Sequence, residues 1–304
     1  MRRSLLVIMC LPFLTTSAWV QTEDLKQYLH EHYANRIFIL RDFLSGDHLS
    51  YDSLGSPTKH AAAGDWTETG FVTIGDDPRI ENNHLVLNAQ RMVVIFSDKR
   101  FQLSAIQRPP KAKKKHGHGP GFVELEIELS GTPSSQSVDA VLSKLFLNSH
   151  DSFVDLVPGY WRFCVSSGLA GRDANCAFAP ELLTMLGTKT EGSQLKEIPI
   201  ASPAKGSIFH VAHDGVSPPK VTHAPEPQFS EAALALKLFQ GTVTLGLVVN
   251  KDGRPSDLRI LQPLGAGLDM KAVQTVENWK FLPAKKNGQP VSVEIAVEID
   301  FHRY

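Results

Sequence analysis

The stretch GTVTLGLVVNKDGRPSDLRIL, residues 241–261, alternates apolar and polar side chains, reaches a turn and then alternates again. The turn at residues 250–253 ends in Gly253, which takes a positive φ at no steric cost. Apolar residues two positions apart share one face of a strand. In the first arm they are Val243, Leu245, Leu247 and Val249. The stretch therefore predicts a β-hairpin with one buried face.

A helix and a long final strand follow this hairpin. Asp269 is predicted to cap the helix, with Leu268 stapled onto Val273. Asn287-Gly288 is a second hairpin signal. The last segment alternates throughout, with Val291, Val293, Ile295, Val297, Ile299 and Phe301 on the inward face. These elements predict a small antiparallel sheet with a helix on one face, an α+β layer.

The order of these motifs resembles the C-terminal domain of TonB and its relatives. The family pattern is a Gly-Thr-Val strand, an Asp-Gly turn, a Leu-Asp helix start, a Trp-x-Phe-x-Pro-Ala exit, a Gly-x-Pro-Val segment and a closing strand. The resemblance covers residues 221–304, and it differs where Phe229-Ser230 stands in place of the usual Tyr-Pro. The structural positions that it implies are Gly241, Gly253, Asp269, Trp279 and Phe281.

The resemblance implies a three-stranded antiparallel sheet packed on helices, and a function in binding. Relatives add a short segment of an outer-membrane receptor to the sheet as a further strand, and an open sheet edge can bind a peptide in this way. Acidic residues on the last strand favour a basic segment; the alternative is that these charges only protect the edge. The expected contact residues are Phe229, Val291, Val293, Glu294, Ile295, Ala296, Val297, Glu298 and Ile299.

The N-terminus predicts an export signal. Arg2 and Arg3 precede the apolar run of residues 4–14, and small residues follow up to Ala18. Residues 1–18 are therefore expected to be a cleaved signal peptide, and the mature protein to be periplasmic. The alternative is an anchor in the inner membrane facing the periplasm, the only case in which membrane contact is expected; however, a spanning helix needs about 20 apolar residues.

Two cysteines remain beyond the signal. Cys164 and Cys176 form an even pair in an oxidising compartment, which predicts a disulfide. The third cysteine, Cys10, lies in the segment that is expected to be removed.

The region between the signal and the TonB-like segment resembles no recognised family. Residues 19–200 predict a β-rich domain of several short strands, with helices over 23–33 and 137–147 and an irregular segment over 151–200. Residues 201–220, rich in Pro, Gly, Ser and His, predict a linker. The domain order is thus signal, β-rich domain, linker and, at residues 221–304, a TonB-like domain.

Composition and motifs narrow the classes of function. The net charge of −1 gives no reason to expect a nucleic-acid partner. No catalytic, phosphate-binding or metal-binding motif is present, so no enzyme, cofactor or metal is expected. The segment KAKKKHGHGPG, residues 111–121, carries two histidines and four lysines that suit a metal or an anionic lipid, but it is typical of a solvated loop.

The sequence therefore predicts an exported TonB-family protein that binds an outer-membrane receptor or another envelope protein, in energy transduction or transport. Two alternatives stay open. One is a periplasmic carrier whose N-terminal domain holds a small ligand or a lipid. The other is an envelope structural module that pairs the final strands of two copies in a homodimer.

Overall fold

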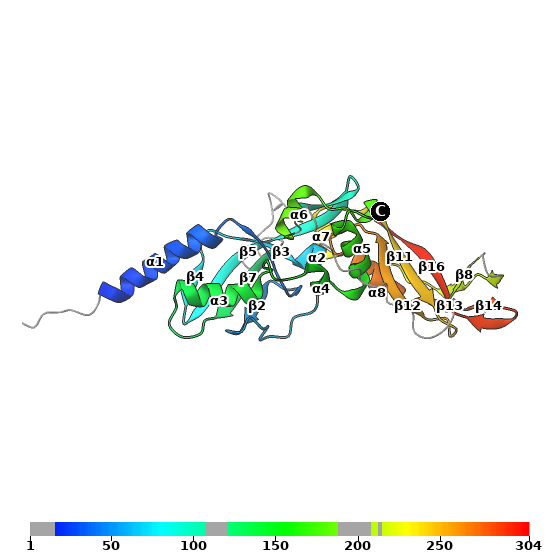
Figure 1. The fold of residues 1–304 in the computed structure, drawn as a ribbon, viewed down its shortest axis with the longest axis horizontal. Coiled ribbons are helices and arrows are strands. Elements are labelled where there is room, and N and C mark those ends of the chain that lie inside the picture. The colour runs from blue at the N-terminus through cyan, green and yellow to red at the C-terminus, as the bar shows by residue number, and fades with distance from the viewer. Residues whose placement is uncertain (1–15, 107–120, 188–207, 212–214, 304) are drawn as a thin grey trace, which may run out of the picture.

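The computed structural model describes residues 16–106, 121–187, 208–211 and 215–303. The molecule is elongated, with helix α1 (Thr16–Tyr33) at one extremity and strand β14 (Ala284–Lys286) at the other (Figure 1). Most of the predicted signal peptide lies outside the described residues, as does nearly all of the lysine-rich segment at 111–121. Within the described ranges, every helix is too short or too polar to cross a membrane.

The N-terminal part is built on a seven-stranded sheet with the central order β1-β3-β5-β7-β2, while β4 and β6 also pair with the long strand β5. All pairs are antiparallel except β2 with β7, which is parallel. The sequence did not predict this parallel pair, because alternation reports the buried face and not the strand direction. The strands are β1 (Ile37–Ile39), β2 (His48–Tyr51), β3 (Phe71–Ile74), β4 (Arg79–Glu81), β5 (His84–Ser97), β6 (Arg100–Ala105) and β7 (Phe122–Glu128).

Helix α3 (Ser135–Leu145) packs on this sheet together with the second half of α1, where Leu25 and Leu29 are buried in the same core. The hydroxyls of Tyr28 and Tyr33 both donate to the carboxylate of Asp139, at 2.7 and 2.6 Å, and so fasten α1 to α3. The spacing that predicted α3 is confirmed, because its apolar stripe is buried: Val138, Val141, Leu142 and Leu145.

The predicted irregular segment at 151–200 is instead helical over much of its described length, so that prediction was wrong. Its helices are α4 (Phe153–Leu156), α5 (Gly159–Leu169), the 3-10 turn η1 (Ala174–Cys176) and α6 (Pro180–Met185). A further short helix, α2 (Trp66–Thr69), precedes β3 in the chain. Glycine and serine in α5 lower its helix propensity. Gly168 is nevertheless required, because a Cβ there would lie 1.7 Å from the carbonyl oxygen of Cys176.

A disulfide joins Cys164 in α5 to Cys176 in η1, with the Cα atoms 5.3 Å apart. It closes the turn between these two elements, and the Cys176 Sγ also lies 3.9 Å from the carbonyl oxygen of Leu261 in the C-terminal part. The covalent bond therefore stands where the two parts of the molecule meet.

The C-terminal part is a four-stranded sheet in the order β12-β11-β16-β8. Its strands are β11 (Gln240–Val249), β12 (Pro255–Gln262), β16 (Val293–His302) and β8 (Phe209–His210). The predicted three-stranded antiparallel sheet is confirmed as β12-β11-β16, while the short parallel strand β8 was not predicted. Helix α8 (Leu268–Val276) lies against β11 and β12, and the short α7 (Glu231–Ala235) adds to the same core.

Two turns shape this part as the sequence predicts. Gly253, in the turn between β11 and β12, has φ +79°, and a Cβ there would lie 2.0 Å from the carbonyl oxygen of Phe281. Asn287 and Gly288 have φ of 49° and 80°, the positive values that a two-residue hairpin needs, and they join β14 to β15 (Gln289–Val291).

Two small ribbons extend from the end of this sheet. Strand β10 (Lys220–His223) pairs with β13 (Lys280–Leu282), and β9 (Val216–Ser217) pairs with β14. The predicted linker, residues 201–220, thus holds short strands where it is described, because its chain adds to edges that the C-terminal part provides.

The predicted role of Asp269 was wrong. Helix α8 begins at Leu268, after Gly267 with φ +73°, so Asp269 lies within the first turn and Leu268 is not outside the helix. The Asp269 carboxylate instead accepts from the backbone N–H groups of Leu264 and Gly265, at 2.8 and 2.7 Å. It therefore fixes the loop before the helix.

Candidate partner-binding edge and the junction behind it

Strand β16 lies between β11 and the short β8. It pairs with β11 over its whole length, from Val293 opposite Val249 to His302 opposite Gln240. On its other side, β8 pairs only with Val293 and Glu294. Among the described residues, no strand pairs with Ile295–Phe301 on that side. We call this stretch of backbone the open edge.

The polar groups of the open edge follow from the alternation of an antiparallel strand. The N–H of Phe209 in β8 donates to the carbonyl oxygen of Ser292 at 3.1 Å, so Ser292 points away from β11. At the other end, the N–H of Arg303 donates to Phe239, which precedes β11, at 3.0 Å. Successive residues of a strand point their backbone groups to opposite sides. The N–H and C=O groups of Ala296, Glu298 and Asp300 therefore face outward.

The side chains of β16 divide between the core and water. Val293, Ile299 and Phe301 are buried, Ile295 and Val297 are half-buried, and Ala296, Glu298 and Asp300 are exposed. The predicted contact residues in β16 thus share a strand, but only some are accessible.

Two other predicted contact residues lie elsewhere. Val291 belongs to β15 and pairs with Ala284, so it is not part of the final strand. Phe229 packs edge-on against Phe301, with the ring centroids 5.5 Å apart, and so supports the sheet from its side. The other predicted structural residues lie around the core: Phe281 is buried, Trp279 is half-buried, and Gly241 leaves room for Leu264, whose nearest atoms would lie 2.8 Å from an added Cβ.

The acidic residues of β16 have different partners. Glu294 forms an ion pair with Arg259 of β12, which lies two strands away. The guanidinium reaches across because Gly246 of β11 has no side chain: a Cβ there would lie 3.1 Å from the Arg259 Nε. Asp300 accepts from the Thr242 hydroxyl at 2.6 Å. Glu298, in contrast, is exposed and has no ion pair within the described residues, so it is available to a cation on a partner.

The opposite edge of the sheet is covered. Helix α5 lies along β12, and η1 also approaches this strand. The disulfide end of η1 reaches Leu261. The described residues of the N-terminal part thus lie on the β12 side of this sheet and not on its β16 side.

Backbone hydrogen bonds join the two parts directly. The N–H of Phe96 in β5 donates to the carbonyl oxygen of Leu264 at 2.8 Å, and the N–H of Ala266 donates back to Val94 at 2.7 Å. Gly265 forms the bridge with Ile95 between them, and a Cβ at Gly265 would lie 2.4 Å from the carbonyl oxygen of Val94. The loop before α8 therefore continues the pairing of the N-terminal sheet.

Side chains of α2 complete this junction. Thr67 accepts at Oγ1 from the N–H of Gly267 at 2.9 Å, and Glu68 accepts at Oε1 from the N–H of Ala232, in α7, at 3.0 Å. Asp65 caps α2 through the N–H of Thr67 and accepts from the indole N–H of Trp161 at 2.8 Å. These contacts are buried among aromatic rings, and one apolar core extends from Trp66 and Trp161 to the strands of the C-terminal sheet.

The carboxyl groups of the junction are poorly solvated. Burial raises the pKa of Asp269 from 3.8 to about 8, and the nearby Asp65 charge acts in the same direction. Burial also raises the pKa values of Asp65 and Glu68. Burial lowers the pKa of Arg91, whose guanidinium donates to the carbonyl oxygen of Thr69 at 3.0 Å. Burial in the junction thus shifts each of these carboxyl groups towards its protonated form, because charge is costly in an apolar surrounding.

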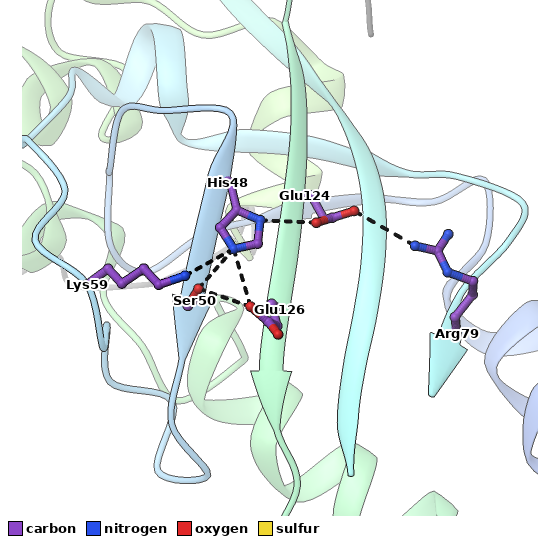
Figure 2. A network of polar contacts seen from close by, with 6 residues as sticks. All are labelled: His48, Ser50, Lys59, Arg79, Glu124 and Glu126. Carbon is purple, nitrogen blue, oxygen red and sulfur yellow. Dashed lines mark hydrogen bonds and ion pairs between the residues drawn. The ribbon is translucent and has the colours of Figure 1, made fainter. Parts of the chain in front are cut away.

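A separate polar network lies on the N-terminal sheet (Figure 2). His48 of the edge strand β2 contacts Glu124 and Glu126 of β7, at 3.0 and 3.2 Å. Ser50 and Lys59 approach the same imidazole, at 3.2 and 3.5 Å. These contacts tie β2 to its neighbour. Among the described residues, no cluster of three or more His, Cys, Asp or Glu side chains is arranged to hold a metal ion, and we assign this network a structural role.

Sequence reasoning missed the junction. Its members come from α2, α5, α7 and the loop before α8, which are far apart in the chain. The one local signal was the capping pattern at Asp65, followed by Thr67.

Comparison with known proteins shows which family the C-terminal part resembles. Residues 225–302 match the family model described as Gram-negative bacterial TonB protein C-terminal. Protein tonB2 of Pseudomonas aeruginosa is 36% identical over 81 residues, an alignment that covers 26% of this chain and 29% of that protein. The matched region is thus less than a third of that relative.

A solved structure is also similar: the solution NMR structure of the Pseudomonas aeruginosa TonB CTD. It is 20% identical, covers 32% of this chain and 96% of that chain, and has a TM-score of 0.25. By the family match, residues 225–302 of this protein form a C-terminal domain of the TonB family.

Proposed function

We propose that the protein is a periplasmic member of the TonB family that captures an extended segment of an outer-membrane receptor, or of another envelope protein, along the open edge. Its role would be in energy transduction or transport at the outer membrane. The family match at residues 225–302 supports the class. The single observation that carries the binding mode is that β16 has no strand partner from Ile295 to Phe301 within the described residues.

Backbone geometry defines what the partner must supply. The outward N–H and C=O groups of Ala296, Glu298 and Asp300 are two residues apart, so an extended segment with its own groups at the same spacing satisfies them. The carboxylates of Glu298 and Asp300 lie beside these groups and are exposed. A captured segment is therefore expected to carry Lys or Arg near the centre of the pairing.

Because the β12 edge is covered, a captured segment can add to the sheet only at its β16 edge. Because α5 and η1 lie against β12, an added strand has only the β16 side available in the described part of this sheet. The N-terminal part thereby restricts binding to one edge.

The test is a titration of the full-length mature protein with synthetic peptides that cover the N-terminal segments of outer-membrane transport receptors. Backbone amide shifts are followed by NMR. The expected result is a set of shift changes in β16 that is larger than in β12, together with slower amide hydrogen exchange at Ala296, Glu298 and Asp300. Binding with no change along β16 would overturn the proposal.

The same edge also suits a second copy of the chain, since two β16 strands can pair with each other. Light scattering across a range of protein concentrations distinguishes the two occupants. If the protein forms a dimer and added peptide does not dissociate it, the result would favour the structural module over peptide capture.

A further inference from the structure

The end of the molecule farthest from α1 carries an unbalanced charge. It consists of residues 215–223, 250–255 and 279–291, which we call the basic tip, and it includes the ribbons around β13 and β14 at one extremity of Figure 1. These segments hold one carboxylate, Asp252, against six cationic side chains. The six are Lys220, Lys251, Arg254, Lys280, Lys285 and Lys286.

The described part of the chain neutralises little of this positive charge. Within the described residues their only ion pair is between Arg254 and Asp252, a contact of 3.9 Å between two exposed side chains. Lys286 lies over the ring of Phe209, at 4.2 Å from its centroid. The protein as a whole has a net charge of −1, so this local excess of positive charge is offset by acidic residues elsewhere.

An apolar side chain stands among these lysines. Leu282 in β13 is 57% exposed. Lys220 lies directly opposite in β10, and Lys280 lies two residues earlier on the same face of the strand. On the other face of this ribbon, Val221 is 43% exposed. Leu282 therefore places an apolar side chain between two lysine side chains, the mixture of basic and apolar groups that interfacial segments carry.

The tip is held in place by the fold. The N–H of Phe281 donates to the carbonyl oxygen of Gly253 at 2.9 Å, which fixes the turn at 250–253 against β13. Ser217 accepts at Oγ from the N–H of Lys285 at 3.1 Å, which fixes β9 against β14. The charges are therefore presented together by ordered strands.

We propose that the basic tip docks on an anionic phospholipid surface. Lysines along the tip would contact the headgroups, and Leu282 would enter the boundary between headgroups and acyl chains, as interfacial segments with mixed basic and apolar side chains do. Among the described residues these ribbons form the end of the molecule, so they can meet a plane together, whereas an acidic peptide would need a groove or a free edge that gathers the separate ribbons. Charge complementarity and the exposed leucine thus favour a lipid surface. This proposal does not depend on capture by the open edge.

The test is co-sedimentation of the full-length mature protein with vesicles of phosphatidylcholine, with and without phosphatidylglycerol. The expected result is binding to the anionic vesicles alone, weakened by added salt. The double variant Lys280→Glu/Lys285→Glu should lose at least about tenfold in affinity, because two attractive charges become repulsive. Leu282→Ser should weaken binding to the anionic vesicles by several-fold with no change in the effect of salt.

The matched control is Lys26→Glu/Lys99→Glu, which makes the same charge change at two exposed lysines of the N-terminal part. It should bind the anionic vesicles nearly as well as the parent protein. Three outcomes would overturn the proposal: no binding to anionic vesicles, an equal loss in both double variants, or binding to polyglutamate but not to vesicles. Circular dichroism of each variant separates loss of binding from loss of fold.

Discussion

The Oγ1 of Thr67 accepts a hydrogen bond from the backbone N–H of Gly267, across 200 positions of the chain and at a distance of 2.9 Å. This buried contact joins the first turn of α2 to the start of α8. It shows that the TonB-type domain is not simply appended to the N-terminal part. The loop that leads into its helix is shaped by a side chain from outside the domain.

Substitution of Thr67 tests how much this contact stabilises the protein. Thr67→Val keeps the shape but leaves the Gly267 N–H without its partner and removes a hydroxyl that donates to Asp65. We expect a loss of about 1–3 kcal/mol in the free energy of unfolding, as for other unsatisfied buried donors. Urea denaturation measures it. Thr67→Ser, which retains the hydroxyl, should lose clearly less; equal losses would show that packing and not the hydrogen bond matters.

The pKa of Asp269 predicts a pH dependence of stability. Its pKa is about 8 in the folded protein against 3.8 in the reference state, so between these values the folded state holds a proton that the unfolded state has released. The contribution of Asp269 to stability is thus fully present below pH 4 and is lost as the pH rises towards 8. Asp269→Asn does not titrate, so its stability should fall less steeply over this range, by up to about 1.4 kcal/mol per pH unit.

Denaturant unfolding at several pH values measures this difference. Since Asp65 and Glu68 also have raised pKa values, the parent and the variant should both retain some slope. Only the difference between the two slopes reports on Asp269. Parallel slopes would mean that Asp269 is ionised in the folded protein throughout.

A proline at Ala296 tests the open edge. The N–H of this residue faces away from β11, so Ala296→Pro removes one outward donor without removing a hydrogen bond within the sheet, as for proline in other edge strands. Peptide affinity should fall by about tenfold, the loss of one satisfied hydrogen bond. Ala296→Ser, which keeps the N–H, is the control. Isothermal titration calorimetry measures both, and unchanged affinity in the proline variant would place binding elsewhere.

Alanine substitutions at two glycines distinguish the cost of backbone strain from the cost of a steric clash. Gly253 and Gly288 have nearly the same φ, +79° and +80°, but an added Cβ meets the carbonyl oxygen of Phe281 at Gly253 and meets nothing within 4 Å at Gly288. Gly288→Ala should cost about 1–2 kcal/mol from the positive φ alone. Gly253→Ala should cost more, because the Phe281 backbone must also shift. Thermal unfolding checks the order, and similar costs would mean that the turn moves freely.

The sequence was sufficient where local pattern and tertiary role agree. Strict alternation predicted β11 and β16, and Gly253 predicted the turn between β11 and β12, because one buried face and one positive φ are readable from neighbouring residues. The pairing of β8 with β16 could not be predicted from the sequence, since tertiary contacts determine which strand lies parallel to Val293. The part of β16 that remains open was also not readable, because it depends on where β8 stops.

Two further features depended on distant residues. The helix α5 was missed because its glycines and serines obscure the helical pattern, although Gly168 is needed for the close approach to Cys176. Asp269 was assigned a capping role because Leu-Asp before an apolar stripe is a common helix start. In the structure Gly267 takes that position, and its N–H is held by Thr67 from another part of the chain.

The pairing of β5 with the loop at 264–266 has a mechanical consequence. A pull along β16 is shared with β11 through a full ladder of hydrogen bonds, and α8 behind β11 is anchored by the same loop. Tension therefore has a noncovalent route into the central strand of the N-terminal sheet, with no need to travel through the peptide bonds that connect the two parts. Shear of those bridging bonds alone would not separate the two parts, because the buried hydrogen bonds of α2, the contact of α5 with β12 and the shared apolar core also resist traction.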